Sequence, residues 1–235
     1  DTRRAFELAI SREATSKLSM KRIGAEISKC LNEERPQQVV SELFSEGLLQ
    51  CLSPELNDPS ILPGRFKLIR GLVKRFSVLG EEIDDEAIYW AGLLSLLEPD
   101  HAVTILDAIG TPHNRRQKIL EALQAMQTIP MQLNRLDESD HPGLFAILEE
   151  LCLETLLALM AYSLDKRNAR KILYFIGKLR HTGPAVSGKD LIEAGIRPGP
   201  HMRRIFSHIT ALKLAGQQLD KEEEIAIARR LYDNI

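Results

Sequence analysis

Apolar residues recur along this 235-residue chain at intervals of three and four, the spacing of one face of an α-helix. No stretch alternates strictly between apolar and polar residues, as a half-buried strand would. The pattern predicts helices over 3–16, from a cap at Ser19, from Pro36 to Gly47, and over 65–79, 84–97, 101–109, 113–128, 166–180 and 220–232, with another from Met131 onward. We therefore expect an all-α protein, an elongated array of roughly a dozen short helices without a significant sheet.

Prolines, glycines and polar turns divide this pattern into three parts. Segment 57–64, NDPSILPG, is expected to be a loop, and the polar turn 137–142 precedes the most apolar region, which should form two short helices. The helix over 166–180 should bury its aliphatic face and turn its cations outward, Lys171 among them. We expect a neck-like region at 1–56, a helical body at 57–165 and a helical tail at 166–235.

The tail contains a predicted pair of helices around a rigid loop. Ser187 is suited to cap the first helix, and Gly195 to end it. The run Arg197-Pro198-Gly199-Pro200 cannot be helical, so a second helix should begin at about Pro200. Asp220 is expected to cap the last helix, with acidic residues in its first turn.

Positive charge gathers around that loop. Helix beginnings beside glycine-containing turns attract phosphate, and such contacts follow a nucleic-acid backbone without reading bases. The candidate RNA-binding residues are Lys189, Arg197, His201, Arg203, Arg204, Lys178 and Arg180. The alternative is an ordinary helical turn whose arginines are solvated. The cations between residues 65 and 75 likewise form either a second basic surface or a solvated helix face.

The formal net charge is −2, so the chain as a whole does not attract nucleic acid. Any binding of nucleic acid must therefore come from a local patch of positive charge. Three scattered cysteines are expected to be reduced thiols in a cytoplasmic protein. No charge-free apolar run has the length of a membrane span, so no membrane partner is expected. The chain begins with Asp1 rather than methionine, and we expect a fragment of a longer protein.

The sequence predicts neither a catalytic residue nor a metal ligand in this chain. Asp84-Asp85 and Asp137 with Asp140 lie at helix starts or turns, where capping is the simpler role. His201 and His208 could share a helix face, but no acidic or cysteine partner accompanies them. Ser187 is explained as a cap, and no glycine-rich phosphate loop is present.

Two segments resemble the class II tRNA nucleotidyltransferases and the related bacterial poly(A) polymerases. Near the start, Ser19, Arg22, Glu26 and Gly47-Leu48-Leu49 match that family's neck and the beginning of its body. Near the end, the matching residues are Gly188, Asp190, Leu191, Gly195, Ile196, Pro198, Gly199, Pro200 and Glu222 to Glu224.

The resemblance implies an enzyme that adds nucleotides to RNA 3′ ends from CTP or ATP with Mg²⁺. Its catalytic head carries a Gly-Ser motif and an Asp-x-Asp metal pair, and this chain has neither. Asp1 and Arg4 have the spacing of part of the family's nucleotide-selecting motif, but they lie too close to Ser19 for the family's layout. The match of Arg22 and Glu26 implies a structural role in stiffening the neck.

Together these observations predict the RNA-gripping helical portion of such an enzyme, inactive alone, with RNA, specifically tRNA, and a catalytic head in cis as partners. No cofactor is expected in this chain. The alternative from another class is a helical protein-interaction scaffold or regulatory domain. The sequence leaves open whether the parent enzyme adds A, C or CCA.

Overall fold

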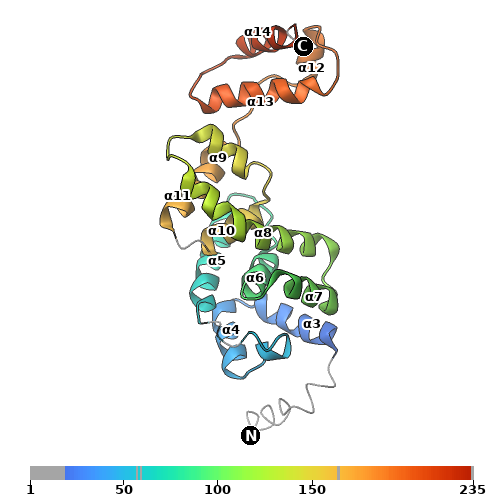
Figure 1. Cartoon of the computed structure of the whole chain (residues 1–235), viewed down its shortest axis with the longest axis vertical. Coiled ribbons are helices and arrows are strands. Elements are labelled where there is room, and N and C mark those ends of the chain that lie inside the picture. Colours follow the sequence, from blue (N-terminus) through green and yellow to red (C-terminus); the bar gives the residue numbers. More distant parts are fainter. Residues whose placement is uncertain (1–18, 57, 59, 163–164, 234–235) are drawn as a thin grey trace. The chain divides into compact units, whose positions relative to one another are not determined.

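The computed structural model describes residues 19–56, 58, 60–162 and 165–233, and this part of the chain contains twelve α-helices and no strand (Figure 1). The helices are α3 (Met20–Leu31), α4 (Pro36–Ser45), α5 (Leu62–Ser77), α6 (Asp85–Leu94), α7 (Pro99–Ile109), α8 (His113–Arg135), α9 (His141–Leu148), α10 (Leu153–Tyr162), α11 (Lys166–Tyr174), α12 (Gly188–Glu193), α13 (His201–Leu214) and α14 (Lys221–Tyr232), with a 3₁₀ turn η1 (Leu49–Cys51) and a π-helical turn η2 (Phe175–Leu179). The all-α prediction is confirmed. The helix predicted over 3–16, with Asp1 and Arg4, lies outside the described residues.

Contacts between these elements divide the chain into two units. The first comprises the described residues of 19–131 and 151–169, and the second those of 132–150 and 170–233. The elongated arrangement and the division at residues 56 and 165 stay predictions.

The first unit is built around α6 and α10, whose residues are buried on every side from Glu86 to Leu94 and from Leu153 to Tyr162. Helix α10 packs against α5 and α6, α4 packs against α5, and α3 packs against α7. An apolar helix covered all round is what a core helix requires. The two nearly continuous apolar runs of the sequence therefore form the centre of this unit.

Buried carboxylates in this core are paired with cations from α8. Arg115 binds Asp84 at 2.9 Å and Glu86 at 2.8 Å, and Lys118 binds Glu154 at 2.6 Å. Burial opposes ionisation of Glu154, but the hydrogen bonds from Lys118 and the Asp84 N–H outweigh it and lower its pKa. These interactions hold α6, α8 and α10 in one arrangement.

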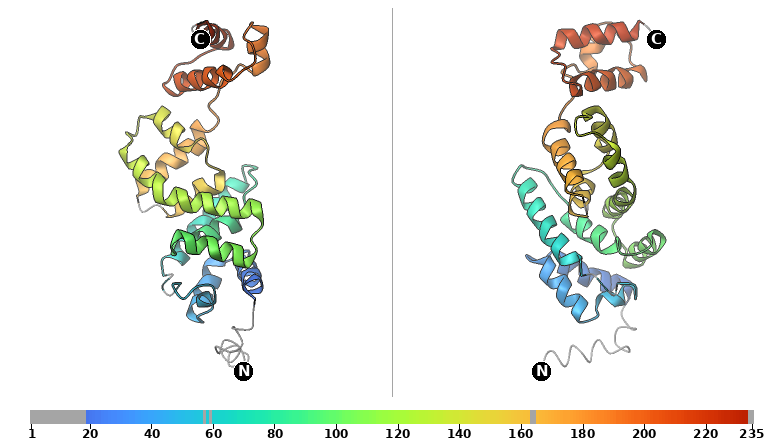
Figure 2. Two further views of the ribbon diagram at one scale, coloured as in Figure 1. Left: turned by 45° about the vertical axis from the view of Figure 1, so that its right-hand side comes forward. Right: turned by 60° about the vertical axis from the view of Figure 1, so that its left-hand side comes forward.

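The second unit contains a small three-helix cluster formed by α12, α13 and α14 (Figure 2). Leu191, Ile196, Ile205, Ile209 and Ala228 fill its core, and each is at most 1% exposed. Helix α13 also packs against α9 of the same unit. The cluster gives the loop between α12 and α13 a fixed base.

Two predicted breaks are wrong, the first for a local reason and the second because of packing. Helix α5 begins at Leu62, so Pro63 and Gly64 lie inside it, and Pro63 occupies a first-turn position that lacks an intrahelical donor anyway. Helix α8 continues through Pro130, where 113–128 and a second helix from Met131 were expected. Ile129 and Leu133 are buried on either side of Pro130, and Asn168 donates to its carbonyl at 3.3 Å.

Candidate nucleic-acid interface

Helix α12 begins with the cap that the sequence predicts. The Ser187 hydroxyl accepts from the Asp190 N–H at 3.3 Å, and Asp190 accepts from the Ser187 N–H at 2.8 Å. This reciprocal capping box satisfies two donors at the helix start. Lys221, on α14, pairs with Asp190 at 2.7 Å. The hydrogen bond from Lys221, followed by those from Ser187, lowers the pKa of Asp190.

The loop that follows is anchored at its centre and turns at its ends. Gly195 has φ of 89°, a left-handed conformation that ends α12 as predicted. Ile196 is buried, while Arg197 and Pro198 are exposed. Helix α13 begins at His201, with Pro200 as its N-cap residue and no side-chain cap. The predicted pair of helices is therefore confirmed, with the second start one residue later.

One side-chain contact links the first turns of α12 and α13. A Cβ added to Gly188, the first residue of α12, would lie 3.8 Å from Cε of Met202 in the first turn of α13. The start of α12 already holds the Asp190 carboxylate, whereas α13 has no side-chain cap, so the N–H groups of its first turn contribute positive potential at the loop.

His201 contributes to this region by holding the loop. Its Nε2 lies 2.6 Å from the Arg197 carbonyl oxygen, and its ring centroid lies 5.0 Å from that of Tyr232. The imidazole thus packs between the loop and α14 rather than projecting into solvent, so it is better placed to fix Arg197 than to contact a ligand through Nε2.

The arginines of α13 and Lys189 of α12 project into solvent. The side chains of Arg203 and Lys189 are each 86% exposed, and Arg197 and Arg204 are exposed as well. Arg203 pairs with Glu150 at 3.5 Å and Lys189 with Glu193 at 3.9 Å. Such surface pairs are weak, so a phosphate can displace the carboxylates.

Lys178 and Arg180 come from the end of η2, the turn in which α11 widens to π-helical hydrogen bonding. Lys178 is exposed and Arg180 is half-buried. They share the second unit with the loop residues. Whether all seven candidates contact one ligand stays a prediction.

Charge along this part of the chain is strongly one-sided. Residues 170–213 of the second unit, called here the basic segment, contain nine lysines and arginines but only two acidic residues, Asp190 and Glu193. The net charge of −2 for the whole chain conceals this local excess. Apart from Lys171 and Lys213, whose ammonium groups bind within the fold, these cations beside the uncapped start of α13 are suited to bind a polyanion.

Three cations bind groups that lie far from them in the sequence, and no local pattern indicates these contacts. Lys171, expected outside, donates to the carbonyls of Leu133 and Leu136 at 2.7 Å each and so caps the end of α8. Lys213 pairs with the buried Glu224, and Arg229 donates to the Ala194 carbonyl at 3.1 Å. These partners lie 11 to 38 residues away, beyond any helical spacing.

At the other end of the described chain, Arg22 and Glu26 lie on α3 and are both exposed. The carboxylate of Glu26 pairs with Lys29 at 2.9 Å, three residues further along α3. The neck-stiffening role of Arg22 and Glu26 stays a prediction.

Two of the four acidic candidates, Asp84 and Asp140, act as helix caps. Asp84 accepts from the Ala87 N–H at the start of α6, and Asp140 from the Gly143 N–H at the start of α9. In the described ranges, histidine, cysteine and acidic side chains form no cluster that could hold a metal ion. Nor does any helix there combine the length and apolar character of a membrane span.

Comparison with known proteins points to one group of enzymes. Residues 4–58 match the family described as the probable RNA and SrmB-binding site of polymerase A. Over 242 aligned residues the chain is 22% identical to the A-adding tRNA nucleotidyltransferase of Geobacter sulfurreducens, covering 99% of this chain and 27% of that protein.

Solved structures share the fold of this chain. The chain resembles the Thermotoga maritima CCA-adding enzyme in complex with tRNA, with a TM-score of 0.75, 17% identity, and coverage of 97% of this chain and 55% of that one. It also resembles a CCA-adding enzyme in complex with ATP, with a TM-score of 0.71, 18% identity, and coverage of 95% and 53%. The chain thus spans about a quarter of the curated relative and about half of these structures.

Proposed function

Because the comparisons support the helical region of the tRNA nucleotidyltransferase family, we propose that this chain binds RNA, and specifically tRNA, through its basic segment. The observation that carries the proposal is the excess of cations in residues 170–213, together with the uncapped start of α13. The bound group would be the sugar-phosphate backbone.

The side chains that face solvent are suited to the sugar-phosphate backbone of RNA. Arg197, Arg203 and Arg204 are charged, flexible and exposed, which suits phosphate oxygens. Phosphate contacts set the position of an RNA but carry no sequence information. The chain would therefore hold an RNA by its shape and charge, and base selection would lie elsewhere.

Nucleotide addition, in this proposal, requires residues outside this chain. The relatives are two to four times as long as the part that the chain spans, and Asp84 and Asp140 act as helix caps here. Mg²⁺ and ATP or CTP would bind to that other part. An incorporation assay with radiolabelled ATP or CTP should detect no addition by this chain alone, and metal-dependent addition would refute this part of the proposal.

A second RNA surface is favoured by one observation, the match of residues 4–58 to a family named for RNA and SrmB binding. Lys21 and Arg22 are the exposed cations at the start of α3. Contacts there would add to those of the basic segment or replace them. The description of the matched family names SrmB as well as RNA, so the alternative role for residues 4–58 is protein binding.

Titrations of tRNA with three charge-reversed variants distinguish the basic segment from the second RNA surface at the start of α3. The tail variant carries Arg197→Glu, Arg203→Glu and Arg204→Glu; the neck variant carries Lys21→Glu and Arg22→Glu. The control carries Lys67→Glu, Lys74→Glu and Arg75→Glu on α5, the same change in net charge as the tail variant. We expect the tail variant to lose at least tenfold more affinity than the control in a filter-binding titration. Equal losses would refute the basic segment as the RNA site, and a larger loss in the neck variant would favour the second surface.

A further inference from the structure

Tyr174 presents an aromatic ring at the surface of the second unit, at the end of α11. Among the phenylalanine, tyrosine and tryptophan side chains that the structure describes, only that of Tyr174 is exposed, and the residue is 40% exposed. The rings of Trp90 and Phe66, by comparison, are buried in the first unit. An accessible ring offers a flat face on which another flat group can stack.

Contacts with α9 support this ring from within the unit. Its centroid lies 5.0 Å from that of His141, the first residue of α9, and the two ring planes are inclined by 36°. The next residue, Phe175, packs edge-on against Phe145 of α9, with the ring centroids 5.9 Å apart. The Tyr174 ring is therefore held in position while part of it stays accessible.

Two exposed cations flank the ring along the helix. Arg170 lies four residues before Tyr174, and Lys178 lies four residues after it. Four residues make slightly more than one turn of an α-helix and slightly less than one turn of a π-helix, so the three side chains follow one side of the helix. In the described ranges neither cation forms an ion pair, unlike Arg203 and Lys189. Both charges are therefore available to a ligand.

The backbone departs from α-helical geometry directly after Tyr174. In the π-helical turn η2 the Arg180 N–H donates to the Phe175 carbonyl, five residues earlier, at 2.8 Å. Such turns inside α-helices occur frequently at functional sites. Gly177 in this turn is exposed, and a Cβ there would meet nothing within 4 Å. Because residues three apart are neighbours on a helix, the surface next to Tyr174 is open.

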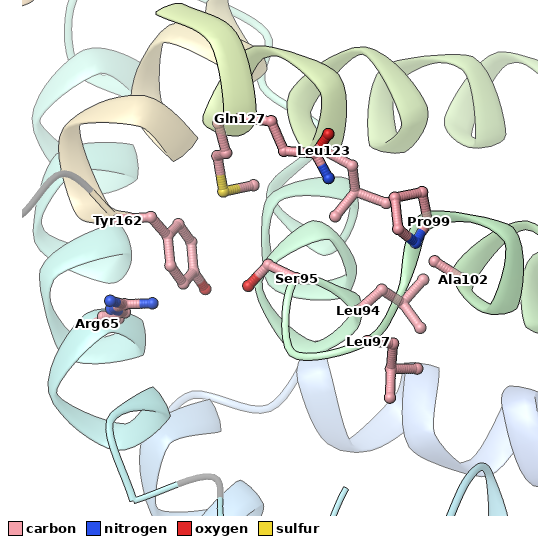
Figure 3. A pocket seen from close by; sticks show the side chains of 10 residues that line it. Arg65, Leu94, Ser95, Leu97, Pro99, Ala102, Leu123, Gln127 and Tyr162 are labelled. Atoms are coloured by element: carbon pink, nitrogen blue, oxygen red, sulfur yellow. The ribbon is translucent and has the colours of Figure 1, made fainter. Parts of the chain in front are cut away.

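A tyrosine of the first unit shows the opposite arrangement. Tyr162 is buried, and the guanidinium carbon of Arg65 lies 4.8 Å from the centroid of its ring, as Figure 3 illustrates. That ring face is occupied by a cation–π contact within the fold. No cation of the described residues covers Tyr174 in this way, so its accessible surface has no partner within this part of the chain.

We propose that an unpaired base of the bound RNA stacks on Tyr174, while Arg170 and Lys178 contact the phosphates on either side of it. An aromatic ring between cations is the combination that binds single-stranded nucleic acid. The base must be unpaired, because a base inside a duplex has no free face. Every base has such a face, so this contact tolerates any sequence. The inference rests on the proposed function and adds a base contact to its backbone contacts.

Titrations of the whole chain with tRNA, oligoadenylate and an abasic oligonucleotide of the same length test this site. Tyr174→Ala should weaken binding of tRNA and oligoadenylate at least about fivefold, the loss expected for one stacked base. Tyr174→Phe, which keeps the ring, should retain the affinity, and Tyr174→Leu, which keeps apolar bulk against His141, should lose it. The abasic oligonucleotide should bind equally to the unmodified chain and Tyr174→Ala. Ile192→Ala, at a 49% exposed residue of the same unit, is the control and should change nothing.

Salt dependence separates stacking from charge. Tyr174→Ala should leave the slope of log K against log salt concentration unchanged, whereas Arg170→Gln and Lys178→Gln should each reduce it by about one unit. Equal affinity of Tyr174→Ala and the unmodified chain for either RNA would overturn the inference, as would equal losses in Tyr174→Phe and Tyr174→Ala. If charge reversal of Arg197, Arg203 and Arg204 abolishes tRNA binding while Tyr174→Ala binds normally, only this inference fails. Failure of the unmodified chain to bind tRNA would refute the proposed function itself.

Discussion

Lys213 on α13 binds the carboxylate of Glu224 on α14 at 2.5 Å, and Glu224 is completely buried. The second carboxylate oxygen accepts the Val186 N–H at 2.9 Å, and Lys213 also donates to the Gly183 carbonyl at 3.1 Å. One ion pair therefore joins α13, α14 and the segment before α12. The proposed RNA surface rests on the cluster that this pair holds together.

Lys213→Met should destabilise the second unit. The substitution keeps an apolar stem but leaves the buried Glu224 carboxylate without its cation. Breaking a buried pair costs about 3–5 kcal/mol, and since Lys213 is 20% exposed we expect a loss of about 3 kcal/mol. Denaturant unfolding measures this loss. Lys189→Met, which removes an exposed pair, is the control, and similar losses in the two proteins would contradict the role assigned to Glu224.

Asp190 should make stability depend on pH. Its pKa in the folded chain is lower than the ordinary 3.8, so its contribution is fully present above 3.8 and is lost as the pH falls toward the folded value. The difference in thermal midpoint between the unmodified chain and Asp190→Asn should therefore shrink steadily below pH 3.8. A difference that stays constant across that range would show that the charge of Asp190 is not what stabilises the start of α12.

Two helical glycines should respond oppositely to alanine. A Cβ at the buried Gly24 of α3 would lie 2.5 Å from Cβ of Ile109 on α7, so Gly24→Ala should cost about 1–3 kcal/mol. Gly71 of α5 is exposed with nothing within 4 Å, so Gly71→Ala should stabilise by about 0.4–1 kcal/mol. Urea unfolding of both variants checks this pair, and a stable Gly24→Ala protein would contradict the close crossing of α3 and α7.

Local chemistry was sufficient to predict most helix boundaries. Ser187 with Asp190, and Asp220 with Glu223, form the capping boxes at the starts of α12 and α14, and both depend on residues three positions apart. Gly195 ends α12 because its left-handed backbone suits glycine. Signals of this kind lie within one turn of the chain and can be found by inspection.

The failures arose where distant partners decide the structure. Pro130 does not end α8, because burial of Ile129 and Leu133 and the contact from Asn168 hold the helix on both sides. Lys171 looked like a solvated cation, since the carbonyls that it caps are more than 30 residues away.

The salt dependence of tRNA binding tests the central proposal most directly. Each cation that neutralises a phosphate contributes about one unit to the slope of log K against log salt concentration. Replacing Arg197, Arg203 and Arg204 with glutamine should therefore reduce the slope by about three units. The same replacement of Lys67, Lys74 and Arg75 should leave it unchanged. Identical slopes for the unmodified chain and the tail variant would contradict RNA binding by the basic segment.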